Sequence, residues 1–175
     1  MVNELEKLIK ECGDWKKISK RTDLTKEFIE KYQDFLIWEH VSRYSQLTEH
    51  EIEKYRFKVH WKNISAFQHL SETFIEDNEC CVVWNEIAHY QKLSESFIEK
   101  HLNKMNLIAL SWGQRLSEDF MWKYRDVLSW TPLSTVQEMS DEFIEKAQDY
   151  LDWERIFKRK DISKEVKKKF RHKRK

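Results

Sequence analysis

A tryptophan recurs every 23 residues along most of this chain, and this spacing constrains the fold more than any other feature. Six tryptophans and one leucine hold these grid positions, with no insertion between them: Trp15, Trp38, Trp61, Trp84, Leu107, Trp130 and Trp153. A period of about 20 to 50 residues is typical of stacked structural units and not of one globular core. The sequence therefore predicts seven consecutive repeats.

A hydroxyl side chain stands ten positions after each grid residue, in all seven repeats. These residues are Thr25, Thr48, Ser71, Ser94, Ser117, Ser140 and Ser163. A Ser or Thr oxygen accepts one of the unpaired backbone N–H groups in the first turn of a helix. The acidic residues that usually follow suit the positive end of the helix dipole. This column therefore predicts seven helix N-caps.

Each repeat is expected to contain two short helices. Behind the hydroxyl, apolar residues such as Phe74, Ile75 and Val82 follow the spacing of an amphipathic helix. We expect about ten residues in this helix and about seven in a second one that begins near the tryptophan, and helices of such length are marginal alone. Caps for the second helix are expected at Asp14, Asn106, Ser129 and Asp152.

The second helix is expected to present one apolar face to the stack. The grid tryptophan is followed by an aliphatic residue three positions on and often by an aromatic residue six positions on, at Tyr44, Phe67 and Tyr90. We expect the tryptophans to be buried, so that Trp61→Ala costs about 3 to 5 kcal/mol. A column of glutamines, Gln68, Gln91, Gln114 and Gln137, is expected to bond loops or neighbouring repeats.

These features predict an all-α protein, an α-solenoid of about seven 23-residue two-helix repeats. Two glycines and one proline leave few of the turn residues that β-hairpins need. We divide the chain into a lead or capping helix (1–14), the repeat array (15–157) and a basic capping helix or tail (158–175). No continuous apolar run suggests a signal peptide or membrane anchor, and three cysteines without a disulfide framework favour a reducing, cytoplasmic compartment.

The phrase "LSESFIEKH" and the spacing of Trp84, Ile87, Tyr90 and Gln91 carry a resemblance. The chain resembles uncharacterised Trp-containing 23-residue repeat proteins of phages and large DNA viruses. In unit size it is similar to the leucine-rich variant repeats. The resemblance implies an architecture and a virus-encoded or similar interaction protein, located in the host cell cytoplasm if viral, and it implies no chemistry.

The fifth repeat departs from the pattern, and residues that serve a ligand are best sought among such departures. It has lost its grid tryptophan, yet it contains the two tryptophans that lie off the grid. The predicted partner-binding residues are Trp112, Arg115, Trp122, Lys123 and Arg125, a composition typical of binding hot spots. The alternative is repacking, in which Trp112 fills space left by Leu107 and Gly113.

The sequence gives no motif for catalysis, a metal or a cofactor. It lacks a Gly-rich phosphate loop, a nucleophile elbow and a His-Glu-x-x-His helix. Cys80, Cys81 and His101 are the one combination considered for zinc, and adjacent cysteines suit a single ion poorly. We therefore expect no enzyme, no metal and no cofactor.

One end of the chain is basic although the net charge is +1. Residues 158–175 carry eleven Lys or Arg and two acids, whereas the rest carries 21 Lys or Arg and 29 acids. This end either caps the stack, binds nucleic acid, or docks head-to-tail on the acidic body of another copy. The nucleic-acid alternative would use Lys167, Lys168, Lys169, Arg171, Lys173, Arg174 and Lys175.

The leading hypothesis is a non-catalytic scaffold that binds and sequesters or blocks a protein partner, such as a host or defence factor. The chain is expected to be a monomer or a weak head-to-tail oligomer that does not enter membranes. The runner-up is a nucleic-acid-associated protein that uses the basic C-terminus. A weaker alternative is a sponge for a small charged metabolite held between repeats, which requires a pocket.

Overall fold

The computed structural model describes residues 7, 9 and 13–174, and these form α-helices and short 3-10 helices without any strand. The all-α solenoid of two-helix repeats is confirmed, because helices with a grid residue at their start alternate with helices that follow a hydroxyl cap. Most of the expected lead helix (1–14) lies outside the described residues. The chain forms two compact units, unit 1 (1–91) and unit 2 (92–175).

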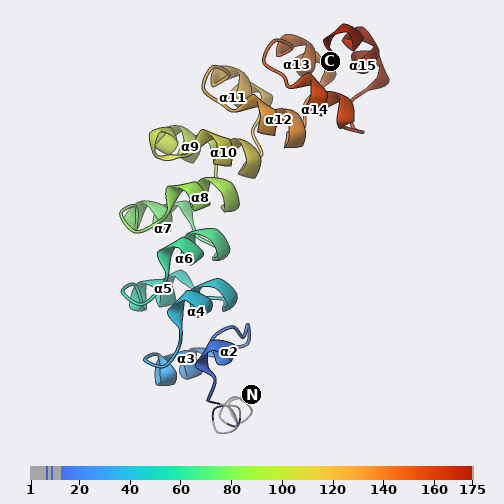
Figure 1. Ribbon diagram of the computed structural model, residues 1–175. Coiled ribbons are helices and arrows are strands. Elements are labelled where there is room, and N and C mark those ends of the chain that lie inside the picture. The colour runs from blue at the N-terminus through green and yellow to red at the C-terminus, as the bar shows by residue number, and fades with distance from the viewer. Residues whose placement is uncertain (1–6, 8, 10–12, 175) are drawn as a thin grey trace. The chain divides into compact units, whose positions relative to one another are not determined.

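Unit 1 contains three and a half repeats of the pattern (Figure 1). Its helices are α2 (Trp15–Ile18), α3 (Lys26–Tyr32), α4 (Trp38–Tyr44), α5 (Glu49–Lys54), α6 (Trp61–Phe67), α7 (Glu72–Asp77) and α8 (Trp84–Tyr90).

Unit 2 continues the alternation and adds two single turns of 3-10 helix. Its elements are α9 (Glu95–His101), η1 (Leu102–Lys104), α10 (Leu107–Gly113), α11 (Glu118–Lys123), α12 (Trp130–Val136), α13 (Asp141–Lys146), α14 (Trp153–Lys158), α15 (Lys164–Lys169) and η2 (Arg171–Lys173). The pattern thus continues through the basic segment, where α15 is the capped helix of the seventh repeat.

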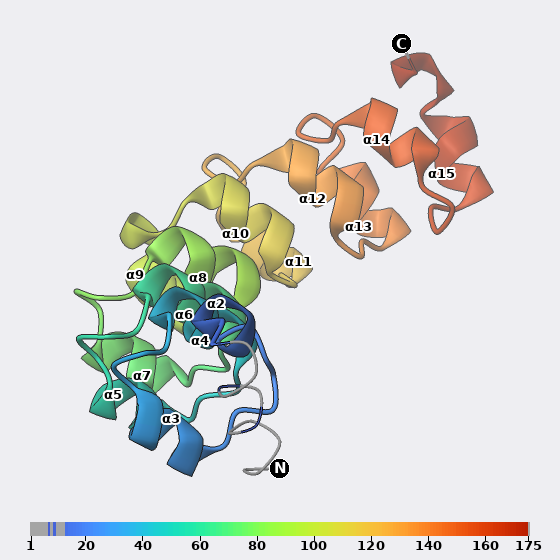
Figure 2. The same ribbon diagram turned by 60° about the horizontal axis from the view of Figure 1, so that its bottom comes forward.

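Each unit consists of two rows of helices that lie side by side. In unit 1, α2, α4, α6 and α8 form the row of grid helices, and α3, α5 and α7 form the row of capped helices (Figures 1 and 2). In unit 2 the grid row is α10, α12 and α14, and the capped row is α9, α11, α13 and α15. In the grid rows α4 packs on α6 and α6 on α8, and α10 packs on α12 and α12 on α14, while in the capped row of unit 2 α13 packs on α15.

All seven predicted hydroxyl caps are confirmed, since each side chain accepts the backbone N–H three residues on. In the grid row, Asp14, Asn106 and Asp152 also cap their helices. The prediction for Ser129 is wrong, because its side chain makes no capping bond. The sequence analysis missed a further cap, at α6. There His60 Nδ1 accepts a hydrogen bond from Asn63 N at 3.4 Å.

The capped helices are shorter than expected, with six or seven residues in place of ten. The chain leaves the helix in a tight turn, in which Lys58 N and Val59 N both donate to Tyr55 O, at 2.8 and 3.0 Å. The turn still buries the apolar residue that the helix pattern predicted, such as Leu36 or Val82.

The core of each unit is made of two aliphatic columns. The first stands three positions after the grid residue and comprises Ile18, Val41, Ile64, Ile87, Leu110, Leu133 and Ile156, all at most 2% exposed. The second lies in the capped helices and comprises Ile29, Ile52, Ile75, Ile98, Met121 and Ile144, all at most 3% exposed. Phenylalanines of the capped helices, such as Phe28, Phe97 and Phe143, are buried beside these columns.

The grid tryptophans are half-buried, which corrects the expectation that their rings form the core. The exception is Trp153, buried against Phe170 with ring centroids 4.6 Å apart. In most repeats the indole N–H donates to the carbonyl five residues earlier, as from Trp38 to Gln33 at 2.8 Å. An indole N–H requires such a partner, and this bond holds the ring where its own helix begins. Trp61→Ala is therefore expected to cost less than the sequence analysis predicted.

The glutamine column links consecutive repeats within each unit, as predicted. Gln68 accepts Leu47 N at 2.9 Å and donates to the carbonyls of Ser42 and Ser45, at 2.9 and 2.8 Å. In unit 2, Gln137 accepts Leu116 N at 3.1 Å. These side chains are buried, so the bonds satisfy backbone groups that water does not reach.

A serine column, missed by the sequence analysis, makes a second link. It stands four positions after the grid residue, at Ser19, Ser42, Ser65, Ser111 and Ser134. Each hydroxyl accepts the backbone N–H 18 residues on, as Ser42 does from His60 at 2.9 Å and Ser134 from Asp152 at 2.9 Å. The recurring hydroxyl, replaced by Ala88 and Phe157 in two repeats, was visible in the sequence, but its partner lies in the next repeat.

Candidate interaction surfaces

Trp122 of the predicted partner-binding set lies at the end of α11, in the capped row of unit 2. Its half-buried ring is flanked by two cations, with Lys146 Nζ 4.3 Å and Arg125 Cζ 4.9 Å from the ring centroid. Tyr150 meets the ring edge-on at 6.3 Å. These contacts form a cation–π cluster within unit 2.

The cluster replaces an ion pair that other repeats form. Elsewhere a glutamate at the position of Trp122 pairs with a lysine of the next repeat, as Glu99 does with Lys123 at 2.8 Å and Glu145 with Lys169 at 2.6 Å. At Trp122 the facing lysine is Lys146, and it meets a ring in place of a carboxylate. Trp122 therefore joins two repeats of unit 2.

Trp112 and Arg115 are not among the contacts of the Trp122 ring. Trp112 is near the end of α10, in the grid row, and remains 42% exposed. This exposure argues against the alternative in which its ring fills the space left by Gly113. Arg115 is exposed in the loop before α11. Among the described residues no ring contact joins Trp112 to Trp122.

The basic segment is partly used within unit 2. Lys167 donates to the carbonyl of Arg159, Lys169 pairs with Glu145, and Lys173 pairs with Asp149 at 2.9 Å. The exposed cations of the predicted nucleic-acid set are Lys168, Lys169, Arg171 and Arg174, whereas Lys175 lies outside the described residues. Lys167 holds a place that is aliphatic and buried in the other repeats, which supports the capping alternative.

No three His, Cys, Asp or Glu side chains come together in a metal-binding group anywhere in the described part of the chain. Of the residues considered for zinc, Cys80 and Cys81 belong to unit 1, and His101 is buried in unit 2 beside Phe97 at 4.6 Å. Nor does any described helix have the length and apolarity needed to cross a bilayer.

Unit 1 carries a surface that the sequence analysis assigned wrongly to the apolar face of the stack. Tyr44, Phe67 and Tyr90 are the last residues of α4, α6 and α8, and they are 38%, 44% and 54% exposed. Together with Arg43 and His89 we call them the aromatic edge. Phe67 and Tyr90 lie 6.2 Å apart between centroids, so the rings of neighbouring repeats form a row.

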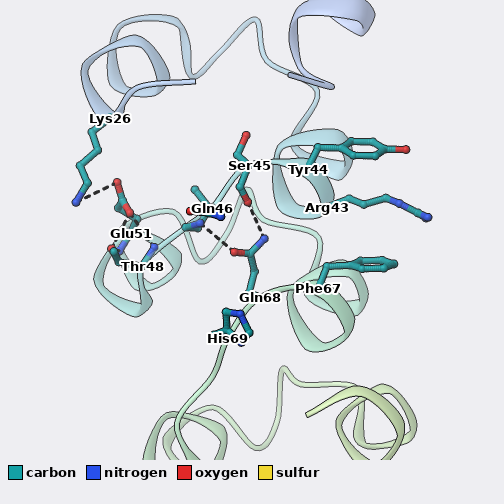
Figure 3. Close-up of a pocket in the computed structure, with 11 residues that line it drawn as sticks. Lys26, Arg43, Tyr44, Ser45, Gln46, Thr48, Glu51, Phe67, Gln68 and His69 are labelled. Atoms are coloured by element: carbon teal, nitrogen blue, oxygen red, sulfur yellow. Dashed lines mark hydrogen bonds and ion pairs between the residues drawn. The ribbon is translucent and has the colours of Figure 1, made fainter. Parts of the chain in front are cut away.

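Cationic and imidazole groups hold the rings of the aromatic edge in place. The Arg43 guanidinium lies between two of them, 4.5 Å from the Phe67 centroid and 5.5 Å from that of Tyr44. Figure 3 shows these three side chains pointing in the same direction, away from the capped row. His89 meets the Tyr90 ring edge-on at 4.5 Å. The edge is therefore an ordered stack although it is exposed.

A hollow of about 440 Å³ opens beside the aromatic edge, between the second and third repeats (Figure 3). Arg43, Phe67, Gln68 and His69 line it on the side of the edge. Its far side is closed by Lys26, which pairs with Glu51 at 3.6 Å. The weaker alternative of a small charged metabolite would need a hollow of this kind.

The charge around the aromatic edge is positive although unit 1 is acidic. The sequence segments that end the grid helices of unit 1 and lead out of them (20–23, 43–46, 66–69 and 89–91) contain Lys20, Arg21 and Arg43 and only one acid, Asp23. Arg21 lowers the pKa of Asp23 through a hydrogen bond, in an ion pair of 2.5 Å. The whole of residues 1–91 carries 13 Lys or Arg and 17 acids.

Comparison of the chain with protein-family models, with curated proteins and with solved structures gave no match. The resemblance to viral repeat proteins therefore stays a prediction, and the function has to be argued from the surfaces themselves.

Proposed function

We propose that this chain is a non-catalytic interaction module that binds an acidic segment of a protein partner along the aromatic edge of unit 1, and thereby sequesters or blocks that partner. The observation that carries the proposal is the exposed, ordered row of Tyr44, Phe67 and Tyr90 with Arg43 inserted into it. Contiguous exposed apolar surface of this kind marks interaction sites.

The composition of the edge suits a protein partner. Tyrosine and arginine are enriched among residues that dominate binding energy at protein interfaces, and large rings contribute contact area at low entropic cost. Because Arg43 already lies between two rings, little side-chain freedom remains to be lost when a partner binds.

The charge pattern selects acidic partners. Carboxylates of a partner are attracted to Lys20, Arg21 and Arg43 and are repelled by the acidic remainder of unit 1. A single-stranded nucleic acid would also stack on aromatic rings, but it is a polyanion that needs a continuous cationic path. The edge offers few cations, so the acidic protein segment fits better.

We place the module in a reducing cytoplasm, where its free cysteines remain thiols. A fixed row of rings at repeat spacing fits an extended peptide, whose side chains alternate along its length. The partner segment is therefore expected to combine Asp or Glu with apolar residues in an extended stretch.

The test is a selection of displayed random peptides on the wild-type chain and on two variants. The edge variant combines Tyr44→Ala, Phe67→Ala and Tyr90→Ala. The matched control is Val136→Ala, which changes an exposed residue at the same repeat position in unit 2. We expect the wild type and the control to enrich acidic, apolar peptides, and the edge variant to bind the enriched peptides at least about tenfold more weakly.

Arg43→Gln should weaken the same peptides and reduce the salt dependence of their binding, because it removes a charge that faces the carboxylates. The proposal is wrong if no peptide class is enriched or if the edge variant binds the enriched peptides as well as the wild type does. Binding of a single-stranded oligonucleotide that the edge variant loses, without peptide enrichment, would establish the nucleic-acid alternative.

A further inference from the structure

Two adjacent cysteines lie in the turn that follows α7 in unit 1. Cys80 is exposed and Cys81 is half-buried, and their Sγ atoms are 3.5 Å apart. The turn is fixed by backbone bonds from Cys81 N and Val82 N to Asn78 O, at 2.9 and 3.0 Å. Neither thiol belongs to the core or to the aromatic edge, so the fold itself does not explain the pair.

An arginine of the preceding repeat contacts this pair. Arg56 Nη2 lies 3.6 Å from Cys81 Sγ, and its Nη1 pairs with Glu53 at 2.9 Å. At the same place in the second repeat, Lys58 donates to the repeat before it and pairs with Asp34 at 2.6 Å. In the third repeat the hydrogen bond runs the other way: Arg56 of the preceding repeat donates and Cys81 Sγ accepts. The pair therefore takes part in a contact between repeats.

We propose that Cys80 and Cys81 are a reversible oxidation site that closes to an intramolecular disulfide when the chain meets hydrogen peroxide. The proposal is independent of the aromatic edge. It assigns a chemical role to an exposed and a half-buried thiol that are already close to one another and adjacent to the Arg56 guanidinium.

The two sulfur atoms have different roles. The neighbouring Cys81 raises the pKa of the Cys80 thiol through their hydrogen bond, so Cys80 keeps its proton more readily. Cys81 lies beside the Arg56 guanidinium, which favours reaction of its sulfur with peroxide. We assign Cys81 as the sulfur that is oxidised first and Cys80 as the resolving thiol.

The reaction balances in two steps. The Cys81 thiolate attacks one peroxide oxygen, the O–O bond breaks, and the leaving hydroxide takes up the proton that the thiol released, forming water and a sulfenic acid. The Cys80 sulfur then attacks Cys81 Sγ, the S–O bond breaks, and hydroxide leaves with the Cys80 proton as a second water. Two thiols lose two electrons in total, and one peroxide is reduced to two waters.

The disulfide is expected to be easily reduced. Adjacent Cα atoms are about 3.8 Å apart, whereas the usual separation in a disulfide is about 4.4 to 6.8 Å, so the bond is strained. Strained and exposed disulfides are the labile ones. Glutathione should therefore reopen the bond, as a reversible site requires.

The experiment uses the full chain with Cys12→Ser, so that only the pair can react, and treats it with stoichiometric hydrogen peroxide. Peptide mapping should show a Cys80–Cys81 bond, the intact mass should fall by two hydrogen atoms, and excess reduced glutathione should restore both thiols. Finding only intermolecular dimers or sulfinic and sulfonic acids would overturn the proposal.

Single variants test the order of the two steps. Cys80→Ser should leave a sulfenic acid at Cys81 that dimedone traps, while Cys81→Ser should trap much less. Arg56→Gln should slow disulfide formation several-fold, and Arg56→Lys should retain most of the rate. Equal trapping in both cysteine variants, or an unchanged rate in Arg56→Gln, would overturn the assigned roles.

Discussion

The two units have the same buried columns but different exposed edges. Three positions after the grid residue, unit 1 has Val41, Ile64 and Ile87 and unit 2 has Leu110, Leu133 and Ile156, all fully buried. Six positions after it, unit 1 has Arg21, Tyr44, Phe67 and Tyr90, whereas unit 2 has Gly113, Val136 and Arg159.

This difference separates the demands of the stack from those of a surface. Where a side chain contacts the next repeat, its size and polarity are constrained by close packing. Where it faces solvent, the stack accepts a ring, a glycine or a valine, whereas Arg159 is largely buried and donates to Ser134 O at 3.2 Å. An aromatic row at an unconstrained position is therefore better explained by a partner than by folding, and the variants below test this separation.

The largest expected effect is on the shared core. Ile64→Ala in unit 1 and Leu133→Ala in unit 2 should each lower the free energy of unfolding by about 3 to 4 kcal/mol, because each leaves a cavity in a fully buried column. Urea denaturation followed by circular dichroism measures both. A cost below about 1 kcal/mol in one unit would show that the units do not share one packing rule.

The glutamine links should come next. Gln68→Met and Gln137→Met keep a similar volume but leave buried backbone groups without a partner, at an expected cost of about 2 kcal/mol each. Urea denaturation measures the free energy of unfolding of these variants too. The exposed Gln46→Met provides the control and should change stability by less than about 0.5 kcal/mol. Equal values for all three would contradict a linking role.

Trp122 tests the repeat contact that differs in unit 2. Trp122→Ala should cost about 1 to 2 kcal/mol, because Lys146 loses the ring that it covers. Trp122→Glu should cost about 0.5 kcal/mol or less, since it allows the ion pair that Glu30 and Lys54 form in unit 1 at 2.7 Å. A double-mutant cycle with Lys146→Gln measures the coupling. If Trp122→Glu costs as much as Trp122→Ala, the ring acts by packing alone.

The smallest effect concerns Glu51, which forms a capping box with Thr48 in unit 1, where the matching residue of unit 2 is Phe120. Burial alone would raise the pKa of Glu51, but hydrogen bonds from Thr48 outweigh it and leave the pKa below its ordinary value. The stabilisation is thus present above the unfolded-state pKa and lost as pH falls through the folded-state pKa.

Glu51→Gln should therefore cost about 1 kcal/mol at neutral pH, and the cost should shrink in acid. Denaturation midpoints measured between neutral and acidic pH test this expectation. Glu138→Gln in unit 2, at an exposed position, is the control and should show no such trend. If the cost of Glu51→Gln does not change with pH, the negative charge of Glu51 does not contribute to the stabilisation.

Features that depend on neighbouring residues in the chain could be predicted from the sequence. The hydroxyl caps are one example, because Ser71 and the N–H of Phe74 belong to the same turn. The glutamine links were also predicted, because a polar residue kept at one place in consecutive apolar units needs a regular partner. The His60 cap was missed, since an imidazole rarely fills that role.

The candidate surface could be predicted only in part. Trp112 is exposed as an interaction residue should be, but Trp122 contacts Lys146 of the next repeat, and that lysine is distant in the sequence. The aromatic residues Tyr44, Phe67 and Tyr90 were assigned to the buried face because their spacing fits either side of a short helix. The spacing of apolar residues alone does not distinguish a buried ring from an exposed one.

The sequence by itself determined the 23-residue repeat, the start of each capped helix and the hydrogen-bonding columns, because these depend on local geometry and on the regular spacing of residue types. The tertiary structure decided that aliphatic columns fill the centre of the core, that most grid tryptophans stay half-buried, and that rings line an open edge of unit 1. Burial depends on the atoms that the next repeat brings near a side chain, and the side chain's own hydrophobicity does not fix where those atoms lie.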